Sequence, residues 1–458
     1  MAQIRRDLTK GSISANLARF AFPVFLSCLL QALYGNADAI IVGQYSDLAN
    51  IAGVTQGSQL TNILTQMISG LSTGASVIIA QYSGSGQMKK TEKAIRTVFT
   101  LFMASALALT GLMLVLNRPL AALLKVNDQA LKPFLEYVGI CELALLFVFM
   151  YNCISAVLQA LGDSRHPLVF VGIASTLNIF LDLFMVGVLK MGARGAALAT
   201  VLAQMVSVLL SVRFLKKNKF SFDFSLKSLG IDAKEARLIF SLGLPYMIQR
   251  LLVYSSYLAI SGLANPYGLV AGSAAGVVSK INGFATIPFS AFTVSISTVA
   301  AQNIGSGSMK RAQQTLYTGF IMSFAFGLLL FVLVQLFPRS IISIFSSDPS
   351  LVDIAAPFLC YYSVEYLLMP FTWSMHGFFT ATGHTLIPSI DGIIAAVVCR
   401  APFALLFSRT LGMGLNGIAL GSALAVGGAI IPAFIFLFSG IWRKPKIKLD
   451  ATGDCDES

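Results

Sequence analysis

Long runs of apolar residues recur along the whole chain, and short segments rich in Gly, Pro, Ser and Lys separate them. Each run is about 20 residues or longer, the length that an α-helix needs to cross a bilayer. Strands of a membrane barrel would instead alternate apolar and polar residues over about ten positions. The pattern therefore predicts twelve transmembrane helices, at residues 14–43, 50–82, 94–117, 131–160, 166–189, 194–215, 236–264, 269–302, 314–337, 351–381, 386–408 and 414–441.

The composition supports this interpretation. Hydrophobic residues make up 56% of the chain and charged residues 11%, and the mean hydropathy is +0.78. A soluble domain carries about 25% charged residues, so we expect an all-α membrane protein. The first apolar run is too long for a signal-peptide core, so we expect it to remain as a helix. The six cysteines are scattered without metal-ligand spacing, which predicts neither disulfides nor a metal site built on them.

The two halves of the sequence resemble each other. The segment AQYSGSGQMKKTEKAIRT from Ala80 matches AQNIGSGSMKRAQQTLYT from Ala301 at an offset of 221, which also pairs ALGDSRHP with ATGHTLIP. An offset of 222 pairs Pro23 with Pro245, and LKMGARGAALAT with LGMGLNGIALGS. These anchors predict two pseudo-symmetric six-helix bundles, a parallel repeat of the kind found in transporters, although duplication can also merely enlarge a scaffold. The predicted boundaries are an N-terminal bundle at 1–213, a basic cytoplasmic linker at 214–236, a C-terminal bundle at 237–441 and a polar cytoplasmic tail at 442–458.

The net charge of +12 is explained by membrane topology. If both termini are cytoplasmic, about two thirds of the 32 Lys and Arg residues fall on the cytoplasmic side, as the positive-inside rule requires. We therefore expect no nucleic-acid partner.

Ionisable residues inside the predicted helices are costly in a bilayer and mark sites or pathways. The first half holds Asp38, Glu142 and Asp182, and the second half holds Arg250, Lys280, Glu365, Asp391 and Arg400. The positions that repeat Asp38 and Asp182 hold apolar or small residues, so these two acids belong to the first half alone.

Asp38 and Asp182 are the candidate cation-coupling residues. Asn178 and Asp182 are one helical turn apart and share a face, and Thr200 adds a hydroxyl from the next helix. Two carboxylates, an amide and a hydroxyl at low dielectric suit a proton or Na⁺. Alternatively, each acid merely satisfies a nearby backbone group or cation.

A second group of residues is assigned to a substrate cavity or to gating: Gln31, Tyr34, Pro23, Glu365 and Arg400. Gln31 and Tyr34 share a helix face with Asp38, and Pro23 weakens the same helix, so that it can bend. Glu365 shares a face with His376. The alternative is that Arg250, Lys280 and Arg400 are counter-ions of Glu365 and Asp391. His166 and His384 lie in short turns, where we expect them to be solvated.

These residues resemble the multidrug and toxic compound extrusion (MATE) family along essentially the whole chain. The resemblance rests on Pro23 and DAIIVG in the first helix, the G-x-G-basic turns after helices two and eight, the turns ALGDSRHP and ATGHTLIP, and NIFLD in helix five. It implies two bundles around a central cavity that opens alternately to either side. It also implies export of amphipathic, often cationic compounds in exchange for H⁺ or Na⁺.

The resemblance also implies roles for single residues. Asp38 matches the family's first-helix aspartate, Asn178 and Asp182 its fifth-helix pair, and Thr200 its sixth-helix hydroxyl. Together they resemble the amino-terminal cation site of prokaryotic members, where Na⁺ could bind. Some members carry an acid in helix seven, and this chain departs from that pattern with Arg250 and no acid.

We therefore expect a secondary active multidrug efflux transporter, with a lipid-precursor flippase of the related superfamily as the alternative. No P-loop, G-x-S-x-G or H-E-x-x-H motif is present in the sequence. We therefore expect that transport is not driven directly by ATP, that the protein is not an enzyme, and that it uses no cofactor besides the coupling ion. The expected partners are small amphipathic or cationic substrates and the lipid bilayer. We expect a monomeric multi-pass protein of a prokaryotic cytoplasmic membrane.

Overall fold

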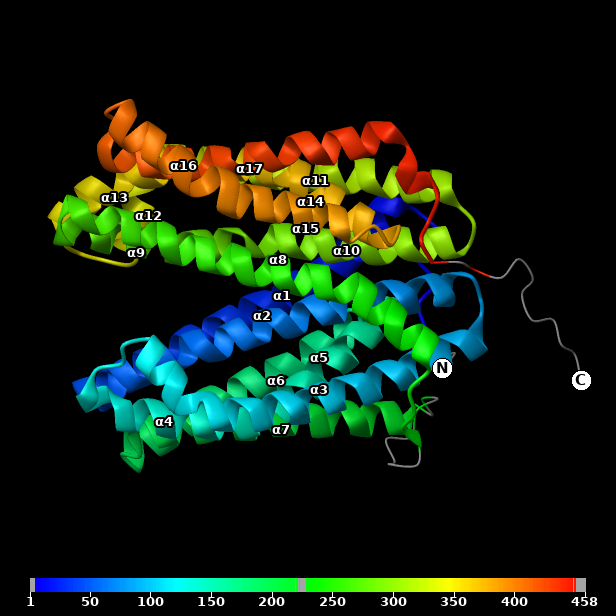
Figure 1. Ribbon diagram of the computed structural model, residues 1–458, viewed down its shortest axis with the longest axis horizontal. Coiled ribbons are helices and arrows are strands. Elements are labelled where there is room, and N and C mark those ends of the chain that lie inside the picture. The colour runs from blue at the N-terminus through cyan, green and yellow to red at the C-terminus, as the bar shows by residue number, and fades with distance from the viewer. Residues whose placement is uncertain (1–4, 219, 221, 223–227, 448, 450–458) are drawn as a thin grey trace, which may run out of the picture. The chain divides into compact units, whose positions relative to one another are not determined.

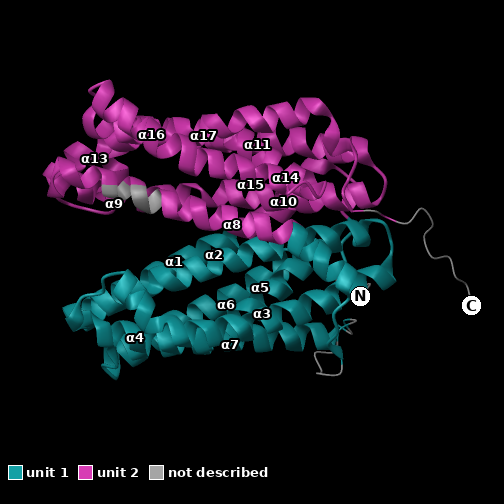
Figure 2. Cartoon of the chain, viewed as in Figure 1, with its two compact units in different colours: residues 1–7, 26–241 teal, residues 8–25, 242–458 magenta. Residues whose placement is uncertain are grey.

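The computed structural model describes residues 5–218, 220, 222, 228–447 and 449, without the side chains of 257–259 and 261–262. All regular elements in these ranges are helices (Figure 1). The described residues divide into two compact units, which Figure 2 colours separately. The all-helical fold class is therefore confirmed.

Unit 1 comprises Met1–Asp7 and Leu26–Ser241. Its helices are the second part of α1 (Ile13–Tyr45), α2 (Leu48–Gly84), α3 (Met88–Leu123), α4 (Asp128–Leu143), α5 (Leu145–Ala160), α6 (Arg165–Asp182), the π-helix η1 (Leu183–Val188), α7 (Gly192–Lys217) and the first part of α8 (Ala233–Ala264).

Unit 2 comprises Leu8–Phe25 and Leu242–Ser458. After the first part of α1 and the second part of α8, its helices are η3 (Asn265–Tyr267), α9 (Leu269–Ala285), α10 (Ile287–Gly305), α11 (Met309–Leu336), α12 (Pro338–Ser343), α13 (Pro349–Tyr362), α14 (Glu365–Ala381), α15 (Leu386–Ile393), η4 (Ile394–Cys399), α16 (Arg400–Leu405), η5 (Leu406–Thr410), α17 (Gly414–Ser439) and η6 (Ile441–Arg443). Of these, η4 and η5 are π-helices.

Eleven helical segments of the described chain are long and apolar enough to cross a membrane. The pair α4 and α5, bent by 46° at its break, makes a twelfth when it is counted as one span. Each segment coincides with one of the twelve predicted helices. The chain is thus a multi-span membrane protein with the predicted number of helices.

The duplication extends to backbone conformation. Four pairs of positions at the offsets of 221 or 222 adopt a positive φ: Gly86 and Gly307 (76° and 80°), Gly162 and Gly383 (93° and 83°), Gly192 and Gly414 (58° and 59°), and Lys190 and Gly412 (55° and 68°). A positive φ favours glycine because a side chain would crowd the backbone. The turns that carry the sequence repeat are therefore also structurally repeated.

Among the described residues, one π-helix of the second half has no counterpart in the first. The offset is 221 at Pro167 and Pro388 and 222 at Leu189 and Leu411, so the second half contains one additional residue between these points. The π-helix η1 has its counterpart in η5, but η4 corresponds to ordinary α-helix within α6. Because a π-helical turn accommodates an inserted residue, the structure assigns the insertion to η4.

The division between the units differs from the predicted boundaries. It lies inside two continuous helices, after Phe25 in α1 and after Ser241 in α8. The predicted bundle boundaries stay a prediction. Within the predicted linker, residues 219, 221 and 223–227 lie outside the described residues, as do 448 and 450–458 of the predicted tail.

The end of the linker is held against α3 within unit 1. Lys93 Nζ lies 2.7 Å from the Asp232 carboxylate. The same carboxylate accepts hydrogen bonds from the backbone N–H groups of Lys234 and Glu235, both at 3.0 Å. Asp232 therefore acts as the N-cap of α8.

Candidate functional site

The predicted coupling residues come together in unit 1. Asp38 of α1 and Asn178 and Asp182 of α6 are buried, with exposed fractions of 7%, 1% and 0%. Thr200 Oγ1 of α7 donates a hydrogen bond to Asp38 Oδ2 at 3.3 Å. The side chains of Asp182 and Asn178 also lie next to the Asp38 carboxylate. Residues from three helices, far apart in sequence, thus form one polar cluster.

The cluster has unused hydrogen-bonding capacity. Within the described part of the chain, Asp38 Oδ1, both carboxylate oxygens of Asp182 and both amide atoms of Asn178 are buried without a hydrogen-bond partner. Buried polar groups are otherwise almost always satisfied. Two adjacent carboxylates in a protein interior also repel each other when both are charged. The oxygens of the cluster therefore suit a proton or a hard cation such as Na⁺.

A small cavity of about 10 Å³ adjoins the cluster. Its lining includes Tyr34, Asn178, Thr200 and Gln204. The amide of Gln204 donates to the Tyr34 hydroxyl at 3.5 Å. This volume has room for about one water molecule, so in this conformation the cavity suits a small ion better than an organic substrate.

The other two α1 candidates lie outside this cavity. Gln31 is exposed and Pro23 is buried within α1, which continues through it. Their assigned roles stay predictions, as do those of the other site residues.

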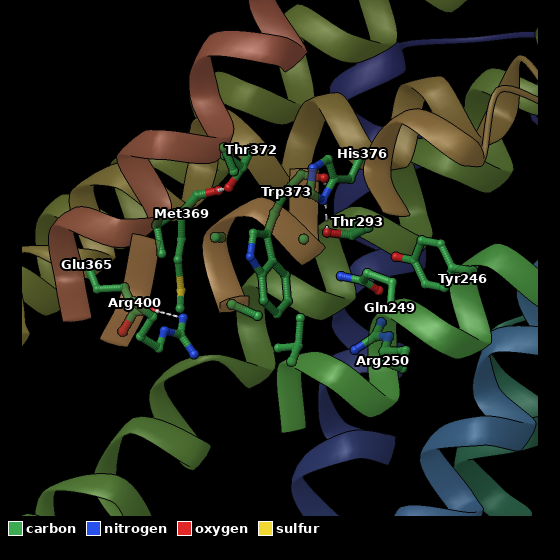
Figure 3. A pocket seen from close by; sticks show the side chains of 16 residues that line it. Tyr246, Gln249, Arg250, Thr293, Glu365, Met369, Thr372, Trp373, His376 and Arg400 are labelled. Atoms are coloured by element: carbon green, nitrogen blue, oxygen red, sulfur yellow. Dashed lines mark hydrogen bonds and ion pairs between the residues drawn. The ribbon is translucent and has the colours of Figure 1, made fainter. Parts of the chain in front are cut away.

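A larger cavity of about 80 Å³ lies within unit 2, and Figure 3 shows its lining. Glu365 and Arg400, both predicted as cavity residues, line it, and Arg400 Nη2 donates to Glu365 Oε1 at 3.5 Å. His376 shares this lining, in agreement with its predicted face, and its Nε2 lies 3.3 Å from Asp391 Oδ2. Asp391 therefore has a histidine, rather than an arginine, beside it.

The alternative that the cations within the predicted helices of the second half are counter-ions of Glu365 and Asp391 holds for only one of the three. Arg400 is a counter-ion, Lys280 is exposed, and Arg250 forms no ion pair with any described residue. The sequence reasoning also missed Gln249 and Trp373 in the cavity lining. A signal existed for Gln249, since it adjoins Arg250 in a predicted helix, but Trp373 resembles any other aromatic residue of a membrane helix.

The two cavities repeat each other. Most lining residues of the unit 1 cavity have their repeat partner in the unit 2 lining, as with Tyr151 and Thr372, Val171 and Gly392, Asn178 and Arg400, and Ser207 and Ala429. For these pairs the offset is 221 before η4 and 222 after it. The same place in the fold therefore carries a cavity in each unit, with different side chains.

The prediction that His384 is solvated was wrong. Its exposed fraction is 7%, its Nδ1 lies 3.0 Å from Thr382 Oγ1, and its ring lies 5.3 Å from that of Phe436. Burial lowers the pKa of His384, and the charge of Lys446 lowers it further. His166 is half-buried at the start of α6, next to Asp163.

Comparison with known proteins identifies the family. The MatE family model matches twice, over residues 23–184 and 245–406, which are related by the offset of 222 found in the sequence. The chain is 28% identical over 441 residues to the probable multidrug resistance protein YpnP of Bacillus subtilis, covering 96% of this chain and 98% of that protein. It is also 28% identical over 456 residues to the probable multidrug resistance protein NorM of Thermotoga maritima, covering 94% of each.

A solved structure shows the same fold. An outward-facing multidrug resistance MATE family transporter of the MOP superfamily superposes with a TM-score of 0.88 at 20% identity, covering 96% of this chain and 98% of that one. The class is that of a twelve-helix, internally duplicated membrane transporter. The chain belongs to the MatE family, the MATE transporters.

Proposed function

We propose that this protein is a secondary active multidrug efflux transporter, which exports amphipathic and cationic compounds by antiport with H⁺ or Na⁺. The observation that carries the proposal is the cluster of Asp38, Asn178, Asp182 and Thr200, whose buried oxygens need a cation. Relatives named as multidrug resistance proteins over nearly the full length support the substrate class. We place the protein in a prokaryotic cytoplasmic membrane as a monomer, with both termini cytoplasmic.

In this proposal the coupling ion acts by neutralising the acids. Without it, Asp38 and Asp182 repel each other in a region of low dielectric. An H⁺ or Na⁺ removes that repulsion and also removes the attraction that the acids exert on a cationic substrate. Ion binding and substrate binding therefore disfavour each other, which is the requirement for exchange.

The test is dye efflux from membrane vesicles, energised by a proton gradient alone and then by a Na⁺ gradient alone. Asp38→Asn and Asp182→Asn should each reduce efflux to the level of vesicles without the protein, because each removes an ionisable group and keeps its shape. Glu142→Gln is the matched control. Glu142 is also buried in unit 1 and accepts a hydrogen bond from Asn117 at 2.8 Å, away from the cluster. Wild-type efflux from either aspartate variant would refute the assignment.

The flippase alternative has one observation in its favour, the arginines Arg250 and Arg400 in the unit 2 cavity. The full-length relatives named as multidrug resistance proteins favour efflux. Parallel assays of drug efflux and of lipid flipping in the same vesicles separate the two functions.

A further inference from the structure

The repeated cavities differ in their charged residues. Among the described residues, the unit 1 lining contains none, although it adjoins the Asp38 and Asp182 cluster, whereas the unit 2 lining contains two arginines and one glutamate. At the position of the Asn178 amide, the second half has the guanidinium of Arg400. At the position of Asp182 it has Ala404, which is buried. The π-helix η4, which contains the inserted residue, ends at Cys399, directly before Arg400. The insertion therefore sets the helical position at which the Arg400 side chain faces the cavity. The position next to the acid cluster in unit 1 is thus occupied by an arginine in unit 2.

Arg250 adds a second cation to the same lining. Its guanidinium lies 5.3 Å from the ring centroid of Tyr246 and forms no ion pair with a described residue. Its Nε is buried without a hydrogen-bond partner in the described part of the chain. The charge of Arg400, by contrast, is compensated by Glu365. The lining therefore has an excess of positive charge, located at Arg250.

Gln249 supplies a neutral hydrogen-bonding group beside Arg250. Its side chain packs on Gly392, where an added Cβ would collide with the amide. Its Oε1 is buried and has no hydrogen-bond partner among the described residues. An amide can reverse by rotation about its last bond and then present its NH₂ group. Arg250 and Gln249 together can thus donate to the oxygens of an acid.

The rest of the lining combines aromatic and apolar side chains with Glu365, His376 and two threonines. In Figure 3, Trp373 projects into the space between Arg400 and Gln249. Met369, with its adaptable thioether, lines the same cavity. Pockets that combine an aromatic wall with a few polar anchors are typical of organic ligands.

We propose that the unit 2 cavity binds the carboxylate of an aromatic organic anion, with Arg250 and Gln249 holding the acid and Trp373 contacting the ring. As a substrate site, the cavity rests on the proposed efflux function and extends it to organic anions. A volume of about 80 Å³ admits the acid group and the ring edge attached to it. An organic cation would be repelled by Arg250.

The test measures binding to the purified full-length protein in nanodiscs, without any gradient. Trp373 and Trp442 are the only two tryptophans of the chain, so Trp442→Phe leaves Trp373 as the single fluorescent reporter. The probe is anthracene-9-carboxylate, which accepts energy from tryptophan. It is compared with the neutral 9-anthracenemethanol and the cationic 9-anthracenemethylammonium. We expect the carboxylate to bind about tenfold more tightly than either, as for a charge-assisted hydrogen bond.

Three further variants, made in the Trp442→Phe protein, test whether Arg250 binds the carboxylate. Arg250→Gln should lower the affinity for the carboxylate about tenfold, to that of the alcohol, and leave the affinity for the alcohol unchanged. Arg250→Lys keeps the charge and should retain most of the carboxylate preference. Arg409→Gln removes an exposed arginine of the same unit and is the matched control. Unchanged affinity for the alcohol shows that Arg250→Gln has folded.

Equal binding of the carboxylate and the ammonium probe would overturn the inference, as would unchanged carboxylate affinity in Arg250→Gln. Chloride that displaces the carboxylate at equal concentration would define an inorganic anion site and overturn the ligand class. The outcome is separable from that of the efflux assay. Carboxylate binding without efflux of any compound would refute the proposed function alone, and efflux of cationic dyes without carboxylate binding would refute this inference alone.

Discussion

At the scale of single residues, the partner of a buried acid decides what the acid can do. Asp391 has His376 at 3.3 Å and Glu365 has Arg400 at 3.5 Å, so the protein itself supplies the compensating group. Asp182 has another carboxylate, Asp38, beside it. Removing one partner of an acid–base pair inside the protein leaves the other partner buried and uncompensated. Two neighbouring acids have no such partner, and a bound ion can compensate their charge. Under the proposed function, this contrast separates the paired acids Asp391 and Glu365 from the proposed coupling acids.

His384 gives a prediction at the same scale. Because burial and Lys446 lower its pKa, the native protein binds this proton less readily than the unfolded chain does. The contribution of His384 to the free energy of unfolding should be fully present above the unfolded pKa of about 6.5. It should decrease as the pH falls below that value. Thermal denaturation in detergent between pH 8 and pH 5 measures this slope.

His384→Gln cannot be protonated and should show a shallower decrease than the wild type. Equal slopes for the wild type and His384→Gln would show that His384 does not contribute.

At the scale of elements, the sequence predicted the transmembrane helices from the length of the apolar runs and the repeated turns from their glycines. The twelve runs coincide with helices because a helix satisfies all backbone hydrogen bonds of a continuous apolar segment within that segment. The anchors of the repeat contain the glycines with positive φ, such as Gly86 and Gly307. The π-helix η4 was not predicted, although the change of offset from 221 to 222 was its signal. Neither apolar pattern nor propensity reveals which turn absorbs an inserted residue.

The repeated turn at Gly307 gives an element-scale prediction. Its φ is 80°, and a Cβ at this position would meet nothing within 4 Å. Gly307→Ala should therefore lower the free energy of unfolding by about 1–2 kcal/mol through backbone strain alone. Gly283→Ala is the matched control, because Gly283 lies in α9 with equally open space. It should raise stability by about 0.5–1 kcal/mol. Melting temperatures of the purified variants give both signs, and a neutral or stabilising Gly307→Ala would contradict the strain.

At the scale of the whole molecule, two continuous helices connect the units. The division in α1 falls two residues after Pro23, and that in α8 falls a few residues before its repeat partner Pro245. Proline removes a hydrogen bond from the helical ladder and permits bending. The sequence predicted the proline and the acid of α1 because both are unusual in an apolar helix. It did not predict that the chain passes from one unit to the other inside that helix, since this depends on tertiary packing.

The last prediction concerns coupling. We expect occupancy of the Asp38 cluster by H⁺ or Na⁺ to shift α1 between two shapes and so to weaken substrate binding. Linkage requires the ion and the substrate to weaken each other's binding by the same factor, about tenfold for typical couplings. The affinity of the purified protein for a cationic dye should therefore fall as the pH is lowered or as Na⁺ is added. Asp38→Asn should flatten this dependence, because the cluster then lacks one of its two acids. Asp391→Asn changes a buried acid of unit 2 and should preserve the dependence. If the dye affinity of Asp38→Asn responds to the ion as strongly as that of the wild type, then Asp38 is not the residue through which the ion acts.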